Sequence, residues 1–237
     1  MTRRRWIADE FSANRAALTG AHADHLICVL RAKVGQEFDI AVTDTVRRGR
    51  ITAIHDHRVE FDLGEEIRAG RQLQITLALA IFKFDRMEWA IEKCTELGVA
   101  RLVPLIAHRT DAHLAVASAK RVERWRRIAR QASEQSRRIS PPEIAEPLKL
   151  REAVGLAGTT RIVLAESEEQ LSLKQALQSY FSDAGVTLAV GPEGGWTLAE
   201  LELFGQSGWI SASLGDTILR AETAAIAAIA IVSSELQ

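Results

Sequence analysis

The chain has 237 residues, of which 47% are apolar and 26% are charged, and its formal net charge is −1. This is the composition of a globular protein with a sizeable core, in one large domain or two ordinary ones. The longest strongly apolar segment, 224–232, is too short to cross a bilayer, and the N-terminal MTRRRWIADEF has charges where a secretory signal has its apolar stretch. We therefore expect a cytoplasmic protein. Cys28 and Cys94 stand at unrelated positions, so we expect two buried thiols rather than a disulfide framework or a zinc site.

Residues 1–70 have the pattern of short strands and turns. Alternating apolar and polar residues predict strands over 37–44, 49–55 and 58–64 (EFDIAVTD, GRITAIH and RVEFDLG). Residues 22–32 (HADHLICVLRA) predict a helix with Leu26, Val29 and Leu30 on one face. The sequence therefore predicts a small β-rich domain, in the form of a compact barrel, that ends within EIRAGRQ.

From Gln74 onward, continuous apolar runs alternate with amphipathic segments. Apolar strands that are each followed by a helix indicate a parallel sheet covered on both faces. The second domain, 71–237, is therefore predicted to be α/β. The predicted strands are 75–82, 101–107, 161–166, 186–190 and 209–215, and the predicted helices are roughly 85–97, 118–138, 170–181, 197–205 and 220–236.

The middle of the chain is basic. Lys and Arg outnumber Asp and Glu by 15 to 9 in 71–150, whereas they are outnumbered by 4 to 11 in 151–237. KRVERWRRIARQASEQSRR predicts a helix with Val122, Trp125, Ala129 and Ala132 turned inward, and Glu134 and Arg138 are spaced for an i, i+4 pair. Such a basic face indicates either contact with a polyanion or only a solvated helix surface.

The stretch GPEGGW, 191–196, lies between the apolar run 186–190 and a helix whose start is marked by the capping pair Thr197 and Glu200. Ligands of open parallel sheets bind at the carboxyl ends of the strands, and glycines let backbone N–H groups approach a ligand closely. The loop lacks the Gly-Lys-Ser/Thr ending and the spacing of phosphate-binding motifs, and Glu193 disfavours a pyrophosphate. It therefore indicates a neutral or cationic ligand, and the alternative is a tight turn without one.

Several motifs, taken together, resemble one family over most of the chain. They are HLICVLRAKVG, DRMEWAIEKCTELGVARLVPLIAHRT, ARQASEQSRRISPPEI, GPEGGWTLAELELF and LGDTILRAETAAIAAIAI. They resemble the ribosomal RNA small subunit methyltransferase E family (RsmE) of the SPOUT class. The resemblance implies S-adenosylmethionine as methyl donor, methylation of a uridine at N3 in the small-subunit (16S) ribosomal RNA, a deep trefoil knot in 71–237, a PUA-like RNA-binding domain in 1–70, and a homodimer. The sequence departs from the family at AVTDTVRRG, where a Phe-Asp-Gly-like turn is usual.

The resemblance also implies that three loops form the cofactor pocket, with leucines against the adenine ring. Glu166 or Glu193 near the sulfonium cation is our inference from charge. The first loop contributes Leu164, Ala165 and Glu166; the second contributes Gly191, Pro192, Glu193, Gly194 and Gly195; the third contributes Leu214, Gly215, Ile218, Leu219, Arg220, Thr223 and Ala224.

Methylation at N3 requires loss of the N3 proton, while negative charge spreads onto the flanking carbonyl oxygens. The site therefore needs a positioned cation and a route for the proton, but no metal. We expect Arg220 to stabilise the oxyanion or orient the base, and Glu222 to be a possible proton acceptor. The alternative for both residues is that they pair with each other or cap the last helix.

Arginines in several segments are candidates for RNA contacts. RRRW, residues 3–6, combines cations with a stacking surface, although Trp6 is more readily explained as a core residue. Phosphate contacts would make RNA binding depend on salt. The predicted RNA-binding residues are Arg3, Arg4, Arg5, Arg31, Arg109, Arg124, Arg127 and Arg138.

Three other functions stay open on the sequence. A SPOUT enzyme acting on the ribose 2′-oxygen or on another RNA base is disfavoured, because LGDTILRAET differs from the Ser-Leu-Asn-type motif of the ribose enzymes. A non-catalytic RNA-binding protein of ribosome assembly would lack affinity for the cofactor. A phosphate-binding nucleotide enzyme is weakened by the missing phosphate loop.

Overall fold

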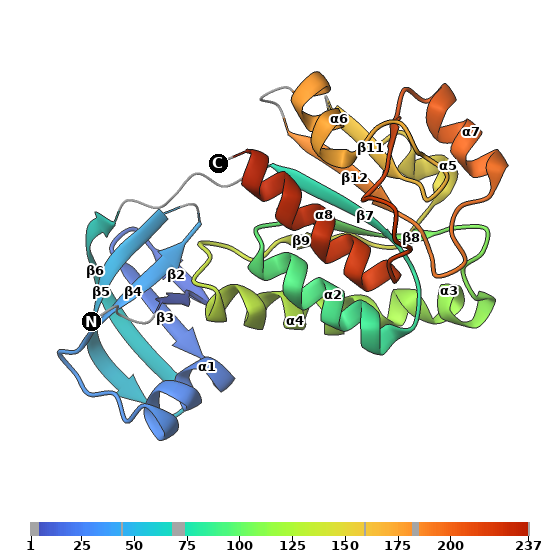
Figure 1. The fold of residues 1–237 in the computed structure, drawn as a ribbon. Coiled ribbons are helices and arrows are strands. Elements are labelled where there is room, and N and C mark those ends of the chain that lie inside the picture. Colours follow the sequence, from blue (N-terminus) through green and yellow to red (C-terminus); the bar gives the residue numbers. More distant parts are fainter. Residues whose placement is uncertain (1–4, 44, 68–73, 159, 182–184, 237) are drawn as a thin grey trace. The chain divides into compact units, whose positions relative to one another are not determined.

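The computed structural model describes residues 5–43, 45–67, 74–158, 160–181 and 185–236 (Figure 1). The predicted RNA contacts Arg3 and Arg4 lie outside these residues. The chain folds into two compact units. The N-terminal unit comprises Met1–Arg71 with Ser133–Pro141, and the C-terminal unit comprises Gln72–Ala132 with Pro142–Gln237. No pattern in the sequence indicated that Ser133–Pro141 packs with the first 71 residues.

The N-terminal unit is built on strands. In its described part six strands form one sheet in the order β1-β4-β5-β6-β3-β2, in which β1 and β4 are parallel and the other neighbours antiparallel. Leu18, Ile40 and Phe61 are central to the core, and Trp6 is buried there too, as its core interpretation predicts. β1, β2 and β3 were not predicted, because strands of three to five residues are too short to show a clear alternating pattern. The strands are β1 (Arg5–Ile7), β2 (Glu10–Ser12), β3 (Arg15–Thr19), β4 (Glu37–Val42), β5 (Thr45–His55) and β6 (Arg58–Ile67).

The helix predicted over 22–32 forms with a different geometry. α1 covers Gly20–Asp24, and a π-helical turn continues it over His25–Val29. The wider i→i−5 turn rotates the chain less per residue than an α-helix does. Leu26 is fully buried and Leu30 packs against the same core, whereas Val29 is 64% exposed, so the prediction that all three lie on one face is wrong for Val29.

The two cysteines differ in their surroundings. Cys28 lies on the π-helical turn and is exposed, so the prediction that it is buried is wrong. Cys94 is buried, and this burial raises the pKa of its thiol to about 12. Cys94 is therefore an unreactive core thiol at neutral pH.

The helix predicted over 118–138 forms as α4 (Val122–Gln135), and a short helix that was not predicted, α3 (Ala112–Ser118), precedes it. α4 ends there because Arg137 has a φ of 60°, which lets the Arg138 N–H donate to the Ser133 carbonyl at 2.8 Å in a Schellman closure. Arg138 therefore lies beyond the helix, and its predicted i, i+4 spacing with Glu134 on one helix face is wrong. The predicted inward residues are all buried: Val122, Trp125, Ala129 and Ala132.

The C-terminal unit has the predicted α/β architecture. In its described part seven strands form one sheet in the order β10-β8-β7-β12-β11-β13, with β9 also paired to β8, and every pairing is parallel. The two shortest strands, β9 and β10, were not predicted. The strands are β7 (Ile75–Ala80), β8 (Arg101–Ile106), β9 (Glu143–Ile144), β10 (Leu148–Lys149), β11 (Thr160–Leu164), β12 (Val186–Val190) and β13 (Ile210–Ala212).

Helices cover both faces of this sheet because alternate residues of its strands point to opposite sides. Leu77 of β7 and Leu188 of β12 pack with α2, α4, α6 and α8, whereas Ala78 and Ala189 pack with α5 and α7. Figure 1 shows α2 and α8 side by side in front of the sheet. None of the helices in the described residues is long and apolar enough to span a membrane. The helices are α2 (Phe84–Glu96), α5 (Leu150–Ala153), α6 (Leu173–Tyr180), α7 (Leu198–Gln206) and α8 (Ala221–Glu235).

Candidate functional site

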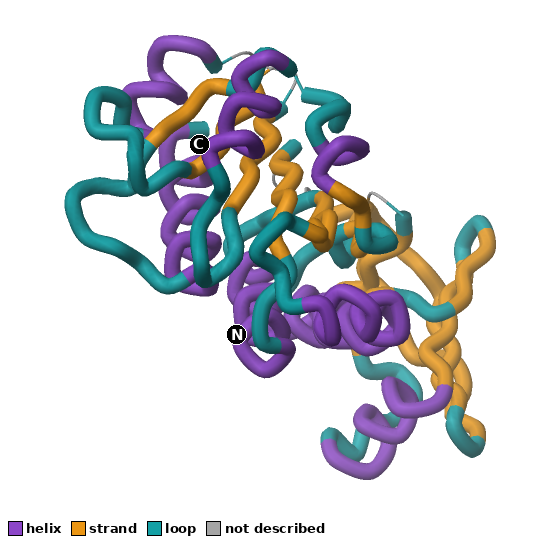
Figure 2. Tube along the Cα trace, turned by 90° about the vertical axis from the view of Figure 1, so that its right-hand side faces the viewer, coloured by secondary structure: helices purple, strands orange, loops and turns teal. Residues whose placement is uncertain are grey.

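A cavity of about 760 Å³ lies where three loops leave the sheet of the C-terminal unit. The loops follow β11, β12 and β13. β11 is paired to both β12 and β13, so the carboxyl ends of these parallel strands meet at one edge. Figure 2, turned by 90° about the vertical axis, shows the right-hand side of Figure 1 with its loops in teal. This edge of a parallel sheet is where ligands bind in open α/β folds.

The glycine loop after β12 is packed against Trp196. A Cβ on Gly191 would lie 3.2 Å from the Trp196 ring, and Gly195 has a φ of 68°. The indole N–H of Trp196 donates to the Leu164 carbonyl at 2.9 Å, which ties this loop to the end of β11. Glycine is needed here for close packing at the first position and for a left-handed backbone at the last.

The downstream end of the same loop is held by a buried carboxylate. The predicted capping box of Thr197 and Glu200 is confirmed. One oxygen of Glu200 accepts from the Thr197 N–H at 2.8 Å and from its hydroxyl at 2.9 Å, while the other accepts from the His108 N–H at 2.7 Å. Glu200 is only 6% exposed, so it rigidly joins the start of α7 to the segment after β8.

Arg109 follows His108 and reaches over the glycine loop. Its guanidinium donates to the Gly194 carbonyl, and the residue lines the cavity. A Cβ on Gly194 would lie 3.3 Å from the Arg109 side chain, so glycine is what allows this approach. Among the described residues that were predicted to contact RNA, Arg109 is the one that lines the cavity.

A second cation lies behind the cavity wall. The Arg86 Nη1 atom of α2 is 2.9 Å from Glu193 Oε1 and 3.7 Å from Glu222 Oε1. Glu222 is 4% exposed and does not belong to the cavity lining, and its Oε2 atom has no hydrogen-bond partner among the described residues. Arg86 was not predicted as a site residue, because the apolar spacing of α2 makes it an ordinary surface position.

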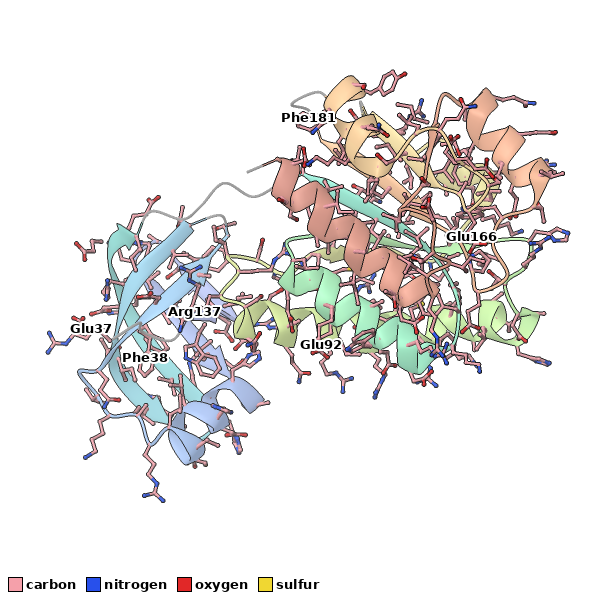
Figure 3. The ribbon with its side chains drawn as sticks, in the orientation of Figure 1. Glu37, Phe38, Glu92, Arg137, Glu166 and Phe181 are labelled. Atoms are coloured by element: carbon pink, nitrogen blue, oxygen red, sulfur yellow. The ribbon has the colours of Figure 1, made fainter. Side chains whose placement is uncertain are left out.

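The cavity wall is acidic. Five lining residues are carboxylic acids, whereas Arg109 and Arg220 are its two arginines. Figure 3 marks Glu166 at this end of the C-terminal unit. An excess of carboxylates favours a ligand that carries positive charge. The five acidic residues are Glu166, Glu168, Glu169, Glu193 and Asp216.

The cavity collects nearly all of the residues predicted to bind a cofactor. Every one of them lines it except Thr223, which is exposed on the first turn of α8. The predicted catalytic residue Arg220 lines it as well. The unpredicted residues are neighbours in the same loops or lie on the adjacent strand end and helix, so a loop-by-loop search would have found most of them. They are Ser167, Glu168, Glu169, Val190, Trp196, Leu201, Ser213, Asp216, Thr217 and Ala221.

The other predicted RNA contacts are spread over the chain. Arg31 and Arg127 are exposed. Arg124 is exposed but holds Glu88 with two hydrogen bonds of 2.6 and 2.8 Å, and this pairing raises its pKa. Arg5 donates to the Arg137 carbonyl within the N-terminal unit. Arg138 is partly buried, which lowers its pKa to about 10.

Metal ligation has no support in the described residues, which contain no group of three or more His, Cys, Asp or Glu side chains able to hold a metal ion.

Comparison with known proteins identifies the family. A family model described as an RNA methyltransferase domain matches residues 69–233. The ribosomal RNA small subunit methyltransferase E of Rickettsia conorii is 33% identical over 212 residues, which are 88% of this chain and 85% of that protein. This chain belongs to the ribosomal RNA small subunit methyltransferase E family.

Further members of the family extend the match to nearly the whole chain. The methyltransferase E of Bacillus subtilis is 29% identical over 93% of this chain and 90% of its own length. The crystal structure of a methyltransferase E from Neisseria gonorrhoeae, bound to S-adenosylmethionine, superposes with a TM-score of 0.85 at 29% identity, over 98% of both chains.

Proposed function

We propose that this protein transfers the methyl group of S-adenosylmethionine to N3 of one uridine in the 16S ribosomal RNA of the small subunit. The observation that carries the proposal is the acidic, glycine-walled cavity at the carboxyl ends of β11, β12 and β13, in a chain that belongs to this methyltransferase family. The solved Neisseria relative contains S-adenosylmethionine, which supports the choice of methyl donor.

The residues of the cavity fit this donor. S-Adenosylmethionine carries a net positive charge, which suits a wall with five carboxylates and two arginines. Ile218 is 81% exposed at the cavity edge, and an adenine ring lying in the cavity would cover such a side chain. The volume of about 760 Å³ is in the range of cofactor pockets. We propose that Leu214, Ile218 and Leu219 contact the ring and that backbone groups of Gly191–Gly195 fix its polar edge.

The bound donor supplies a methyl group activated by its sulfonium. The chain must orient the uridine and stabilise the charge that appears on its carbonyl oxygens as the N3 proton leaves. Arg220 is exposed on the cavity wall, so its guanidinium can reach a base at the opening. We propose that it donates to a uridine carbonyl oxygen, which gains strength as that oxygen becomes negative. Glu222, the predicted proton acceptor, lies outside the lining and is better suited to hold Arg86.

The proposal extends to the rest of the molecule. For residues 71–237 it includes the deep trefoil knot of SPOUT enzymes, and for 1–70 a PUA-like domain that binds RNA. A homodimer and a cytoplasmic location belong to the same proposal. Light scattering of the purified protein would test the dimer, and a monomer at micromolar concentration would contradict it.

The decisive experiment maps modified bases in 16S ribosomal RNA from cells with and without the gene. Mass spectrometry should find one N3-methyluridine that is lost without the protein and restored when purified protein and S-adenosylmethionine are added to the RNA or the small subunit. Loss of a 2′-O-methyl group or of another methylated base would replace the proposed target. An unchanged modification pattern would overturn the function.

A further inference from the structure

Three charged side chains form a chain that runs from the interior of the C-terminal unit to the cavity wall. Glu222, at the start of α8, has a side chain that is 6% exposed and lies 3.7 Å from Arg86. Arg86 is 31% exposed and lies 2.9 Å from Glu193, which is 41% exposed and lines the cavity. The order from inside to outside is therefore carboxylate, guanidinium, carboxylate.

The guanidinium is positioned to set the charge of the wall. Arg86 itself does not line the cavity, but it hydrogen-bonds to a carboxylate that does. A carboxylate with an arginine at hydrogen-bond distance attracts a nearby cation much less than a free one does. Glu222 keeps the guanidinium in place from behind, since this buried carboxylate has Arg86 as its ion-pair partner among the described residues.

A charged ligand bound in this cavity interacts electrostatically with Glu193. Glu193 lines the cavity, and salt screens the interaction of two charges only in part when they are closer than about one Debye length, 8–10 Å. S-Adenosylmethionine and its product S-adenosylhomocysteine differ by one methyl group and one positive charge on sulfur. A change of charge on the wall therefore alters the affinity for the two ligands unequally.

We propose that Arg86 is a specificity-determining residue. Its positive charge offsets the negative charge of Glu193 and so limits the preference of the cavity for the cationic methyl donor over the product, whose sulfur is uncharged. Glu222 is a positioning residue that holds Arg86. This inference rests on the proposed function for the identity of the two ligands. Its consequence is that the donor is not bound so tightly that it fails to exchange with the product at the same site.

The test is calorimetric titration of the full-length protein with each ligand separately, which needs no RNA. The Arg86→Met variant removes the positive charge and keeps a long side chain. The ratio of the dissociation constant of S-adenosylhomocysteine to that of S-adenosylmethionine should rise by about fivefold, the order expected for one uncompensated charge at this range. Glu193→Gln should lower the ratio, and the double variant should return it close to the wild-type value. Arg86→Lys, which keeps the charge, should change it little.

The matched control is Lys93→Met. Lys93 also lies on α2 and also holds two carboxylates, Glu92 at 2.7 Å and Glu96 at 2.8 Å, but none of the three lines the cavity. For Lys93→Met, the ratio of the two dissociation constants should equal that of the wild-type protein. If Arg86→Met does not fold, Arg86→Gln removes the same charge and carries the same test.

The outcomes separate the inference from the proposed function. If Arg86→Met weakens both ligands equally, Arg86 only supports the loop and the inference is overturned. If the wild-type protein methylates RNA but Arg86→Met leaves the ratio of the two dissociation constants unchanged, only the inference is overturned. A wild-type protein that binds neither ligand overturns both proposals.

Discussion

Arg47 in the N-terminal unit and the two arginines that line the cavity of the C-terminal unit serve different purposes. In the N-terminal unit, Arg47 donates to the carbonyls of Ala13, Leu63 and Gly64 at 2.8 to 3.0 Å and so joins β5 to β6 and to the turn between β2 and β3. In the C-terminal unit, Arg109 and Arg220 face a cavity. The number of cations in a segment therefore does not locate a functional surface, because an arginine can equally bind backbone carbonyl groups of the fold.

The largest effect is expected when an arginine that lines the cavity is replaced. Arg220→Ala should lower the rate of methyl transfer by about 100-fold to 1,000-fold, because a donor to the developing oxyanion is lost. Calorimetry should still detect binding of S-adenosylhomocysteine, since the loss falls on the chemical step. Near-normal turnover would remove Arg220 from the mechanism.

A smaller effect is expected at the buried carboxylate that anchors the glycine loop. Glu200→Ala leaves the His108 N–H and both donors of Thr197 without their acceptor, so urea unfolding should show a loss of about 2–3 kcal/mol in the free energy of unfolding. Glu202→Ala is the control, because Glu202 is exposed on the same helix. An equal effect in both variants would contradict the anchoring role.

The structural use of arginine in the N-terminal unit can be measured directly. Arg47→Met should lower the free energy of unfolding by about 1–2 kcal/mol, because its hydrogen bonds to carbonyl groups are lost. Arg50→Met, at an exposed position of the same strand, should stay within about 0.5 kcal/mol. If Arg47→Met weakens RNA binding at low salt and leaves stability unchanged, the contrast between the two units fails.

The smallest effects are predicted for two tryptophans of the C-terminal unit, of which one lines the cavity and the other does not. Trp196→Phe and Trp209→Phe each remove an indole donor, to the Leu164 carbonyl at 2.9 Å and to the Val154 carbonyl at 3.0 Å. Each should cost about 1 kcal/mol of stability. Only Trp196 lines the cavity, so only Trp196→Phe should also weaken binding of S-adenosylmethionine in calorimetry. Weakening by both variants would show that the effect is one of general stability.

By itself the sequence determined the architecture of the C-terminal unit and the place of its cavity. Continuous apolar runs can be buried on both faces only in a covered parallel sheet, and the loop 191–195 with its capped helix marks a strand's carboxyl end. Short strands such as β1 were beyond it, since a few residues carry no period. The end of α4 was also beyond it, since the turn at Arg137 has no glycine to announce it.

The charged groups that act together could be identified only from the folded chain. Arg86 and Glu193 are separated by 107 residues, and Arg109 and Gly194 by 85. No local pattern links such positions, because their proximity depends on the order of the strands in the sheet. Glu222 lies behind the cavity wall although its neighbours Arg220 and Ala221 line it, because successive residues of a helix point in different directions.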